Sequence, residues 1–179
     1  MKKLCISVVL LIGIAISSCS KEQSLQQYFI ANAENPNFMS FDLPSSLLNL
    51  DKVDLSASEK EVAASLKKMN VLVFQKKIEN IADYEIQKSA INSILKSSEY
   101  NELMKMNTSM GKATIQIKGD GDTIDEVIVY GDNDDKGLIL VRVLGDDMNP
   151  ASFVQIVKKM EKSDFNVKGI KLFDNLIKG

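Results

Sequence analysis

Hydrophobic and polar positions alternate in the middle of the chain, with the period of two residues that is typical of half-buried strands. The clearest alternation predicts three strands, separated by turns rich in glycine and aspartate. These strands span residues 113–118, 126–130 and 138–144. The last is apolar at every position except Arg142, which is typical of a strand covered on both faces. We therefore expect Leu140 and Val141 in the core, on opposite faces of a central strand.

Two shorter apolar segments, 38–43 and 71–74, predict further strands. Elsewhere apolar residues recur every three or four positions, which predicts helices. The expected helices span residues 24–33, 45–50, 58–69, 83–95, 100–104 and 149–160. Ser58, with Glu61 three residues later, fits a capping box for the third of them, and Asp83 fits a cap for the fourth.

These elements predict a single α+β domain over residues 24–179. We expect a mixed or antiparallel sheet of about five strands, with helices mainly on one face. Near the C-terminus, residues 165–167 predict a short edge strand. Residues 171–178 have a weakly amphipathic pattern that fits either a helix or a frayed tail.

The N-terminal segment has the features of a bacterial signal peptide. Lys2 and Lys3 precede an apolar run over residues 4–16, which is too short to span a bilayer comfortably. The run ends in Ile16-Ser17-Ser18-Cys19, which resembles a lipobox. This resemblance implies cleavage before Cys19 and acylation of that cysteine. The alternative is an ordinary secreted protein with a free thiol.

The lipobox implies a protein of the cell envelope that is anchored by its N-terminus. We assign residues 1–18 to a lipoprotein signal peptide and residues 19–23 to the lipidated cysteine and a polar tether. Several acyl chains make a stable anchor. Ser20, directly after the cysteine, resembles the sorting pattern for delivery to the outer membrane.

Charge and composition exclude several classes of function. Removal of Lys2 and Lys3 with the signal peptide changes 22 basic and 24 acidic residues to 20 and 24, a net charge of −4. No basic stripe remains, so we expect no nucleic-acid partner. The absence of histidine excludes Ser-His-Asp and Cys-His catalysis and the usual zinc hydrolase sites. No phosphate-binding or dinucleotide-binding glycine pattern is present, so we expect no cofactor.

Acidic residues gather in turns at one end of the predicted sheet. They are Asp120, Asp122, Asp146 and Asp147. In an up-down-up meander these turns meet, and their carboxylates could bind a hard cation weakly. Hairpin turns use aspartate and glycine for conformational reasons as well, which accounts for each of these residues. The segment after Asp132 begins like a calcium loop, but Val143 stands where a bidentate acid is needed. We therefore favour turns over a metal site.

Met104, Met106 and Met110 lie close together in the sequence. A cluster of thioethers can bind Cu(I). Methionine is also a common residue for filling gaps in a core, and we favour that interpretation here.

Four segments of the chain together resemble one known family. They are the lipobox, Phe41-Asp42-Leu43-Pro44, Tyr100-Asn101-Glu102-Leu103-Met104 and the meander from Glu126 to Asp146. Together they are similar to the domain of unknown function 4252 family of envelope proteins from Bacteroidota. The resemblance covers most of the mature chain. It implies an envelope location, and it carries over no activity and no catalytic residue.

We expect a lipid-anchored envelope protein of the outer membrane that acts as a non-enzymatic binding or accessory module. Its expected partners are the membrane, through the lipid on Cys19, and another envelope protein. Two alternatives stay open. One is an envelope hydrolase that uses a carboxylate pair or a serine-lysine pair, and the other is an accessory of an envelope-signalling circuit.

Overall fold

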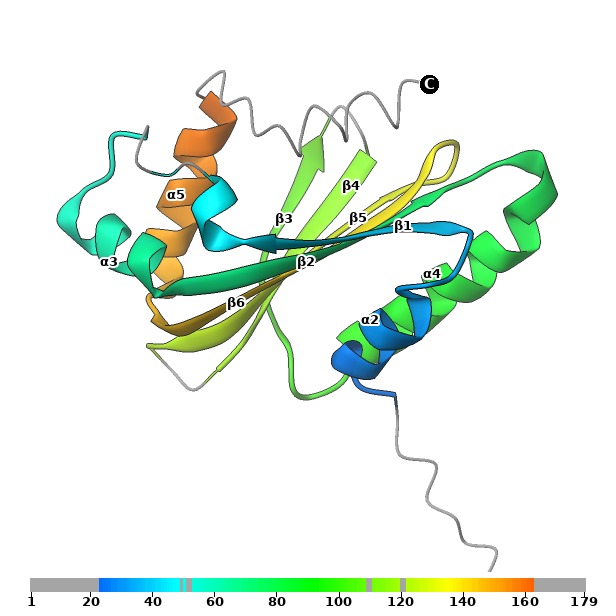
Figure 1. Cartoon of the computed structure of the whole chain (residues 1–179), viewed down its shortest axis with the longest axis horizontal. Helices are drawn as coiled ribbons and strands as arrows, with labels where there is room; N and C mark the ends of the chain where they lie inside the picture. Colours follow the sequence, from blue (N-terminus) through cyan, green and yellow to red (C-terminus); the bar gives the residue numbers. More distant parts are fainter. Residues whose placement is uncertain (1–22, 49, 51–52, 109–110, 120–121, 163–179) are drawn as a thin grey trace, which may run out of the picture.

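The computed structural model describes residues 23–48, 50, 53–108, 111–119 and 122–162 (Figure 1). The helices are α2 (Leu25–Asn32), α3 (Ala57–Ser65), α4 (Ile81–Leu95) and α5 (Pro150–Lys162), with 3₁₀ turns η1 (Ser45–Leu48) and η3 (Ile78–Asn80). The strands are β1 (Phe38–Pro44), β2 (Leu66–Gln75), β3 (Asn101–Thr108), β4 (Gly111–Lys118), β5 (Ile124–Asn133) and β6 (Gly137–Met148). The elements expected at residues 165–167 and 171–178 lie outside the described residues.

The strands of the described part form one antiparallel sheet in the order β1-β2-β6-β5-β4-β3. Strand β6 pairs with β2 on one side and with β5 on the other, which confirms residues 138–144 as a central strand. The predicted α+β class is therefore confirmed. The sheet has six strands, one more than expected.

The additional strand is β3, which stands where we expected a helix over residues 100–104. Met104 pairs with Ile115 of β4, and Met106 pairs with Ala113. Alternation with a period of two therefore continues beyond the short window that fitted a helix. Strand β4 pairs with this segment from Asn101 to Thr108, and these hydrogen bonds favour a strand over the predicted helix.

The N-cap of helix α3 lies two residues earlier than predicted. Its N-cap is Ser56, whose side chain accepts a hydrogen bond from the backbone N–H of Glu59. The Glu59 carboxylate accepts a hydrogen bond from the backbone N–H of Ser56 in return, at 2.6 Å. The predicted box of Ser58 and Glu61 is therefore wrong, because two serine-glutamate pairs with the same spacing overlap at this place.

Strand β2 also begins earlier than predicted, at Leu66, and α3 is correspondingly shorter than the predicted helix. Leu66 and Met69 were expected on the helix, but both lie in β2, where Met69 pairs with Val143 of β6. Their spacing of three residues is that of a helix, and a register shift between Leu66 and Lys68 is what brings both side chains to the second core. Helix α4 follows the N-cap Asn80, and Asp83 lies in its first turn.

The helices are divided between the two faces of the sheet, rather than lying mainly on one. Helices α2 and α4 contribute to a first core, together with Leu72 and Leu140 of the central strands. Helices α3 and α5 contribute to a second core with Val127 and Val143. Alternate positions of the central strands are apolar on both sides, so both faces need a cover.

The predicted placement of Leu140 and Val141 on opposite faces is confirmed. Leu140 is 0% exposed in the first core, and Val141 is half-buried against the second. Aromatic rings extend the first core toward β1, with centroid distances of 6.4 Å from Tyr28 to Phe38 and 5.2 Å from Phe38 to Phe74. These contacts hold α2 on this face of the sheet.

Candidate functional site

The face of the sheet that carries the second core is apolar from one edge to the other. Residues directly opposite one another in an antiparallel sheet lie on the same face, so the register defines rows that cross all six strands. The first row is Met39, Val73, Ile139, Gly131, Ala113 and Met106. The second row is Phe41, Val71, Val141, Val129, Ile115 and Met104. We call these two rows the apolar sheet face.

A third row continues the pattern toward α3 and α5. It is made of Leu43, Met69, Val143, Val127 and Ile117. Phe153 and Ile156 of α5 and Val62 of α3 belong to the same core as Val143 and are buried. The two helices therefore cover this end of the face.

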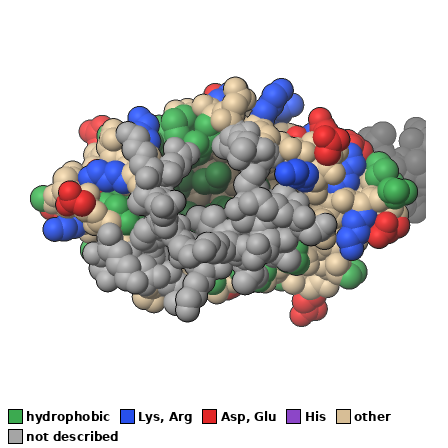
Figure 2. Space-filling model, turned by 90° about the horizontal axis from the view of Figure 1, so that it is seen from above, with side chains coloured by type: hydrophobic (Ala, Val, Ile, Leu, Met, Phe, Trp, Pro, Cys, Tyr) green, Lys and Arg blue, Asp and Glu red, His purple; other side chains and the backbone are tan. Residues whose placement is uncertain are grey.

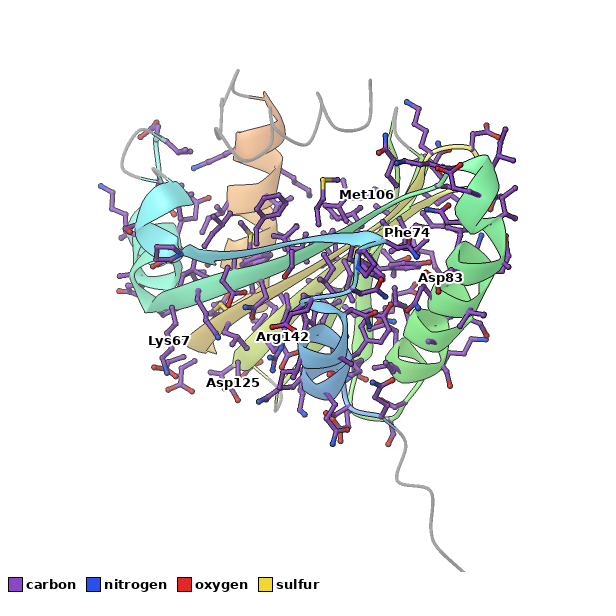
Figure 3. The ribbon with its side chains drawn as sticks, turned by 45° about the vertical axis from the view of Figure 1, so that its right-hand side comes forward. Lys67, Phe74, Asp83, Met106, Asp125 and Arg142 are labelled. Atoms are coloured by element: carbon purple, nitrogen blue, oxygen red, sulfur yellow. The ribbon has the colours of Figure 1, made fainter. Side chains whose placement is uncertain are left out.

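Much of the apolar sheet face is covered only in part. Its half-buried members are Met39, Phe41, Met104, Met106, Ala113, Val129, Gly131, Ile139 and Val141. Figure 2 shows hydrophobic side chains on the upper side of the molecule. Figure 3 shows the Met106 side chain on the side of the sheet where α5 stands. Partly exposed apolar residues that adjoin one another in this way make the face a candidate binding surface.

The composition of the face favours an adaptable contact. Met39, Met104 and Met106 belong to it, and Met69 adjoins it in the third row. Methionine side chains are flexible and polarisable, and they are frequent on surfaces that accept differently shaped apolar partners. Met110, the third member of the expected thioether cluster, lies outside the described residues. Met104 and Met106 lie here as parts of a continuous apolar surface.

The opposite side of the sheet carries a polar cluster that joins α4 to the β5–β6 hairpin. The Lys88 ammonium lies 2.7 Å from a carboxylate oxygen of Asp132 and 2.7 Å from one of Asp134. The Tyr84 hydroxyl donates a hydrogen bond to Asp132. The Lys76 ammonium lies 4.3 Å from the centroid of the Tyr84 ring, a cation–π contact.

The protonation states in this cluster suit a structural role. Burial lowers the pKa of Lys88, but hydrogen bonds to Asp132 and Asp134 outweigh burial, and the pKa lies above its ordinary value. Burial and the hydrogen bond to Asp132 raise the pKa of Tyr84. The hydrogen bond from Lys88 lowers the pKa of Asp134. Lys88 is therefore held as a cation and Tyr84 as a neutral phenol, and neither is a ready proton acceptor.

A second ion pair is almost fully buried near the middle of the sheet. Arg142 donates to both carboxylate oxygens of Glu126, at 2.8 and 2.9 Å. The two side chains are only 13% and 6% exposed. Burial, followed by the charge of Glu126, raises the pKa of the neighbouring Tyr100 to about 12. The pair is bidentate, so the charge of Arg142 is already neutralised by Glu126 and few of its N–H groups are left to bind a ligand.

The segments of the predicted acidic turns do lie at one end of the sheet, because Ile124 after the β4–β5 turn pairs with Met148 at the end of β6. Asp146 makes an ion pair with Lys67 at 2.6 Å. Asp122 and Asp147 are exposed. The predicted turn at Asp146 and Asp147 is wrong, because both residues lie within β6, where Asp147 has a φ of 48° at the register shift between β5 and β6. Asp120 lies outside the described residues, as does Cys19.

In the described ranges, no group of three or more histidine, cysteine, aspartate or glutamate side chains is placed to hold a metal ion. A hollow of about 590 Å³ opens between η1 and α3. Ser45, Ser46 and Lys60 contribute to its lining. Lys60 is exposed to solvent, whereas a lysine that acts as a base needs a desolvated setting.

Sequence reasoning missed the apolar sheet face as a candidate site. The signal was present as alternation in every strand, but each apolar residue by itself looks like an ordinary core residue. Only the pairing register of all six strands shows that the apolar positions align in continuous rows.

Comparisons with known proteins place the chain in a family without defining an activity. The family described as Domain of unknown function (DUF4252) matches residues 28–156. No curated protein and no solved structure matches the chain. Within the part of the chain that the structure describes, none of the helices is both long and apolar enough to cross a membrane.

Proposed function

Because the chain belongs to the DUF4252 family, whose description names no activity, we propose from its own residues that it is a lipid-anchored cell-envelope protein acting as a non-enzymatic binding module. The observation that carries this proposal is the apolar sheet face, which leaves Met39, Ile139 and Met106 half-buried. A surface of this kind contributes binding energy through burial of apolar area, without any catalytic group.

The proposed anchor supports a protein partner over the membrane itself. The tether from Cys19 to Gln23 reaches at most about 17 Å when fully extended, because each residue spans about 3.3–3.6 Å. It enters the domain at Ser24, the N-cap of α2, and α2 packs on the face opposite the apolar sheet face. So short a tether holds the α2 side near the lipid and turns the apolar sheet face away. The Ser20 pattern favours the outer membrane as the place of anchoring.

The dimensions of the face define the chemistry of the partner. Six strands at a spacing of about 4.8 Å span about 24 Å, and two rows occupy about 7 Å along the strands. An α-helix with one apolar stripe matches this shape, because its diameter is about 10 Å and 16 residues span about 24 Å. We therefore propose that the partner is an amphipathic helical segment of another envelope protein, bound by its apolar side.

The hydrolase alternative has less support from the described residues. The polar cluster around Lys88 is closed by its own ion pairs, and the serine-lysine hollow contains an exposed lysine. A role as an accessory in envelope signalling is compatible with the proposal, since it too needs a partner-binding surface.

The test is capture of partners from the protein's own membranes with a matched pair of variants. Met106 and Asn107 are neighbours on the edge strand β3, with side chains on opposite faces. Met106→Lys should abolish capture of a protein that the wild type retains, because a lysine on the face would be desolvated by the partner. Asn107→Lys should retain it. Equal capture by both variants would show that the face is not the binding surface.

A further inference from the structure

We infer that the outer surface of α2 and α4 rests on the lipid bilayer, with Ile30 and Ile86 inserted among the lipid headgroups. This contact rests on the proposed function, because only a chain that is anchored through Cys19 is held at a bilayer. It fixes the orientation of the domain, which the anchor alone leaves free, and it directs the apolar sheet face away from the membrane.

Large apolar side chains that are exposed to solvent gather on the helices of this side. In the described ranges they are Ile30 on α2, Ile78 on η3, and Ile81 and Ile86 on α4. Ile30 is 68% exposed and Ile86 is 63% exposed. Among the side chains that the structure describes, α3, α5 and the strands contribute none. Single exposed apolar residues are common on soluble proteins, but their restriction to one layer of helices indicates a surface that meets an apolar environment.

Helices α2 and α4 lie side by side and form this layer together (Figure 1). The Tyr28 hydroxyl of α2 donates a hydrogen bond to the side-chain oxygen of Gln87 on α4 at 2.8 Å. Ile30 follows Tyr28 by two positions, about 200° around its helix, and Ile86 is turned about 100° from Gln87. Both isoleucines are therefore directed away from the contact between the helices, and both lie on the outer surface of the layer.

The proposed anchor brings this surface to the lipid. The tether from Cys19 to Gln23 reaches at most about 17 Å, and it ends at Ser24, where α2 begins. Ile30 lies about 9 Å further along the helix axis. So short a tether keeps the surface at a millimolar effective concentration next to the bilayer, so that even a weak contact is occupied. The acyl chains hold the protein, and the isoleucines need only to orient it.

The outer surface of α2 suits the headgroup region because it carries no charge. The segment from Ser24 to Ala33 contains no charged residue, and its exposed side chains include Gln26, Gln27 and Ala31 beside Ile30. A charged side chain would lose hydration on contact with the lipid, at a large cost in free energy, whereas these side chains lose little.

The acidic residues next to Ile86 do not prevent the contact. Asp83 accepts hydrogen bonds from Asn37 at 2.8 Å and from Gln87 at 3.0 Å, so it is already engaged within the domain. Glu85 is exposed. Because a surface of this kind enters only about 5–10 Å into the boundary of headgroups and acyl chains, the Glu85 carboxylate stays hydrated while Ile86 inserts.

The experiment uses the acylated full chain, purified from membranes and reconstituted in vesicles of phosphatidylethanolamine and phosphatidylglycerol. Cysteine replaces Ile86, or Gln155 on α5 as the matched exposed control on the opposite side of the sheet. Acylation blocks Cys19 and cleavage removes Cys5, so the new thiol alone takes the fluorophore NBD. The vesicles contain or lack a phosphatidylcholine with a nitroxide near the head of its acyl chain, which quenches fluorophores that touch the lipid. The contact predicts several times more quenching at position 86 than at position 155, and the same for Ile30→Cys.

Each other outcome overturns the inference. Equal quenching at positions 86 and 155 would show that the domain has no preferred orientation or a different one. A blue-shifted emission at position 86 that the nitroxide does not quench would show that a second copy or another protein covers the surface. A protein that leaves the vesicles would overturn the anchor, and the lipid contact with it.

Partner capture separates the two proposals. If positions 86 and 155 are quenched equally while Met106→Lys still loses the partner, the lipid contact is wrong and the binding function of the apolar sheet face stands. If position 86 is quenched selectively while Met106→Lys captures normally, the lipid contact stands and the proposed function is wrong.

Discussion

Truncation of Leu140 to alanine should destabilise the domain strongly, because its side chain is 0% exposed in the central strand β6. Leu72 and Tyr130 stand directly opposite it on the two neighbouring strands, and all three belong to the first core. Three buried carbon atoms at about 0.8 kcal/mol each account for about 2.4 kcal/mol of transfer free energy. The cavity left between fixed neighbours adds to this, for a total of about 2–5 kcal/mol.

Val141→Ala is the matched control, because Val141 is the next residue of the same strand and is half-buried on the other face. It removes two carbon atoms that are only partly buried, so its cost should be about 1 kcal/mol. Urea unfolding of both variants, compared at equal slope, gives the two changes in the free energy of unfolding. If Leu140→Ala costs no more than Val141→Ala, the assignment of β6 as the centre of the first core is wrong.

Further predictions concern the anchor, the acidic turns and an ion pair. Cys19→Ala should leave an unprocessed or mislocalised chain with its fold intact, and mass spectrometry of the wild-type N-terminus should find acyl groups on Cys19. The melting temperature should be the same in chelator as in calcium at about 1 mM, because Asp122 and Asp147 are exposed and Asp146 is paired with Lys67; a rise of several degrees in calcium would require a folded-state site. A hydrogen bond from Lys159 lowers the pKa of Glu59, so their pair stabilises the fold above the ordinary carboxyl range and is lost as the pH falls through the lowered pKa. Lys159→Met should therefore lower the melting temperature more at about pH 7 than at about pH 2, where only the hydrogen bond from Lys159 to the Asp54 carbonyl oxygen is lost, and an equal loss at both would contradict this reasoning.

Local alternation predicted the central meander well, because β5 and β6 have apolar residues at nearly every inward position. It failed at β3 and at the start of β2, where Leu66 and Met69 have helical spacing and a register shift in the strand brings both to one face. In both places the outcome depends on hydrogen bonds to a strand that is distant in sequence. The division of helices between the two faces is likewise a tertiary property.

The candidate site was less accessible to sequence reasoning than the fold. Carboxylates in turns such as Asp122 attract attention as possible ligands, whereas apolar residues such as Ile139 are read as core. The apolar sheet face exists only because the register aligns residues as distant as Met39 and Met106 on one surface. The pairing of Lys88 with Asp132 also joins residues far apart in the sequence, and no local pattern indicates it.

The central claim is that the apolar sheet face, from edge to edge, is one binding surface. Met39 on β1 and Met106 on β3 lie at opposite edges of the sheet, on the same row. The direct measurement is the amount of captured partner, relative to wild type, for Met39→Lys and Met106→Lys, with Ser40→Lys and Asn107→Lys as controls on the opposite face. The account predicts that both methionine variants lose the same protein at least tenfold, while both controls retain it. Undiminished capture by either methionine variant would contradict the claim.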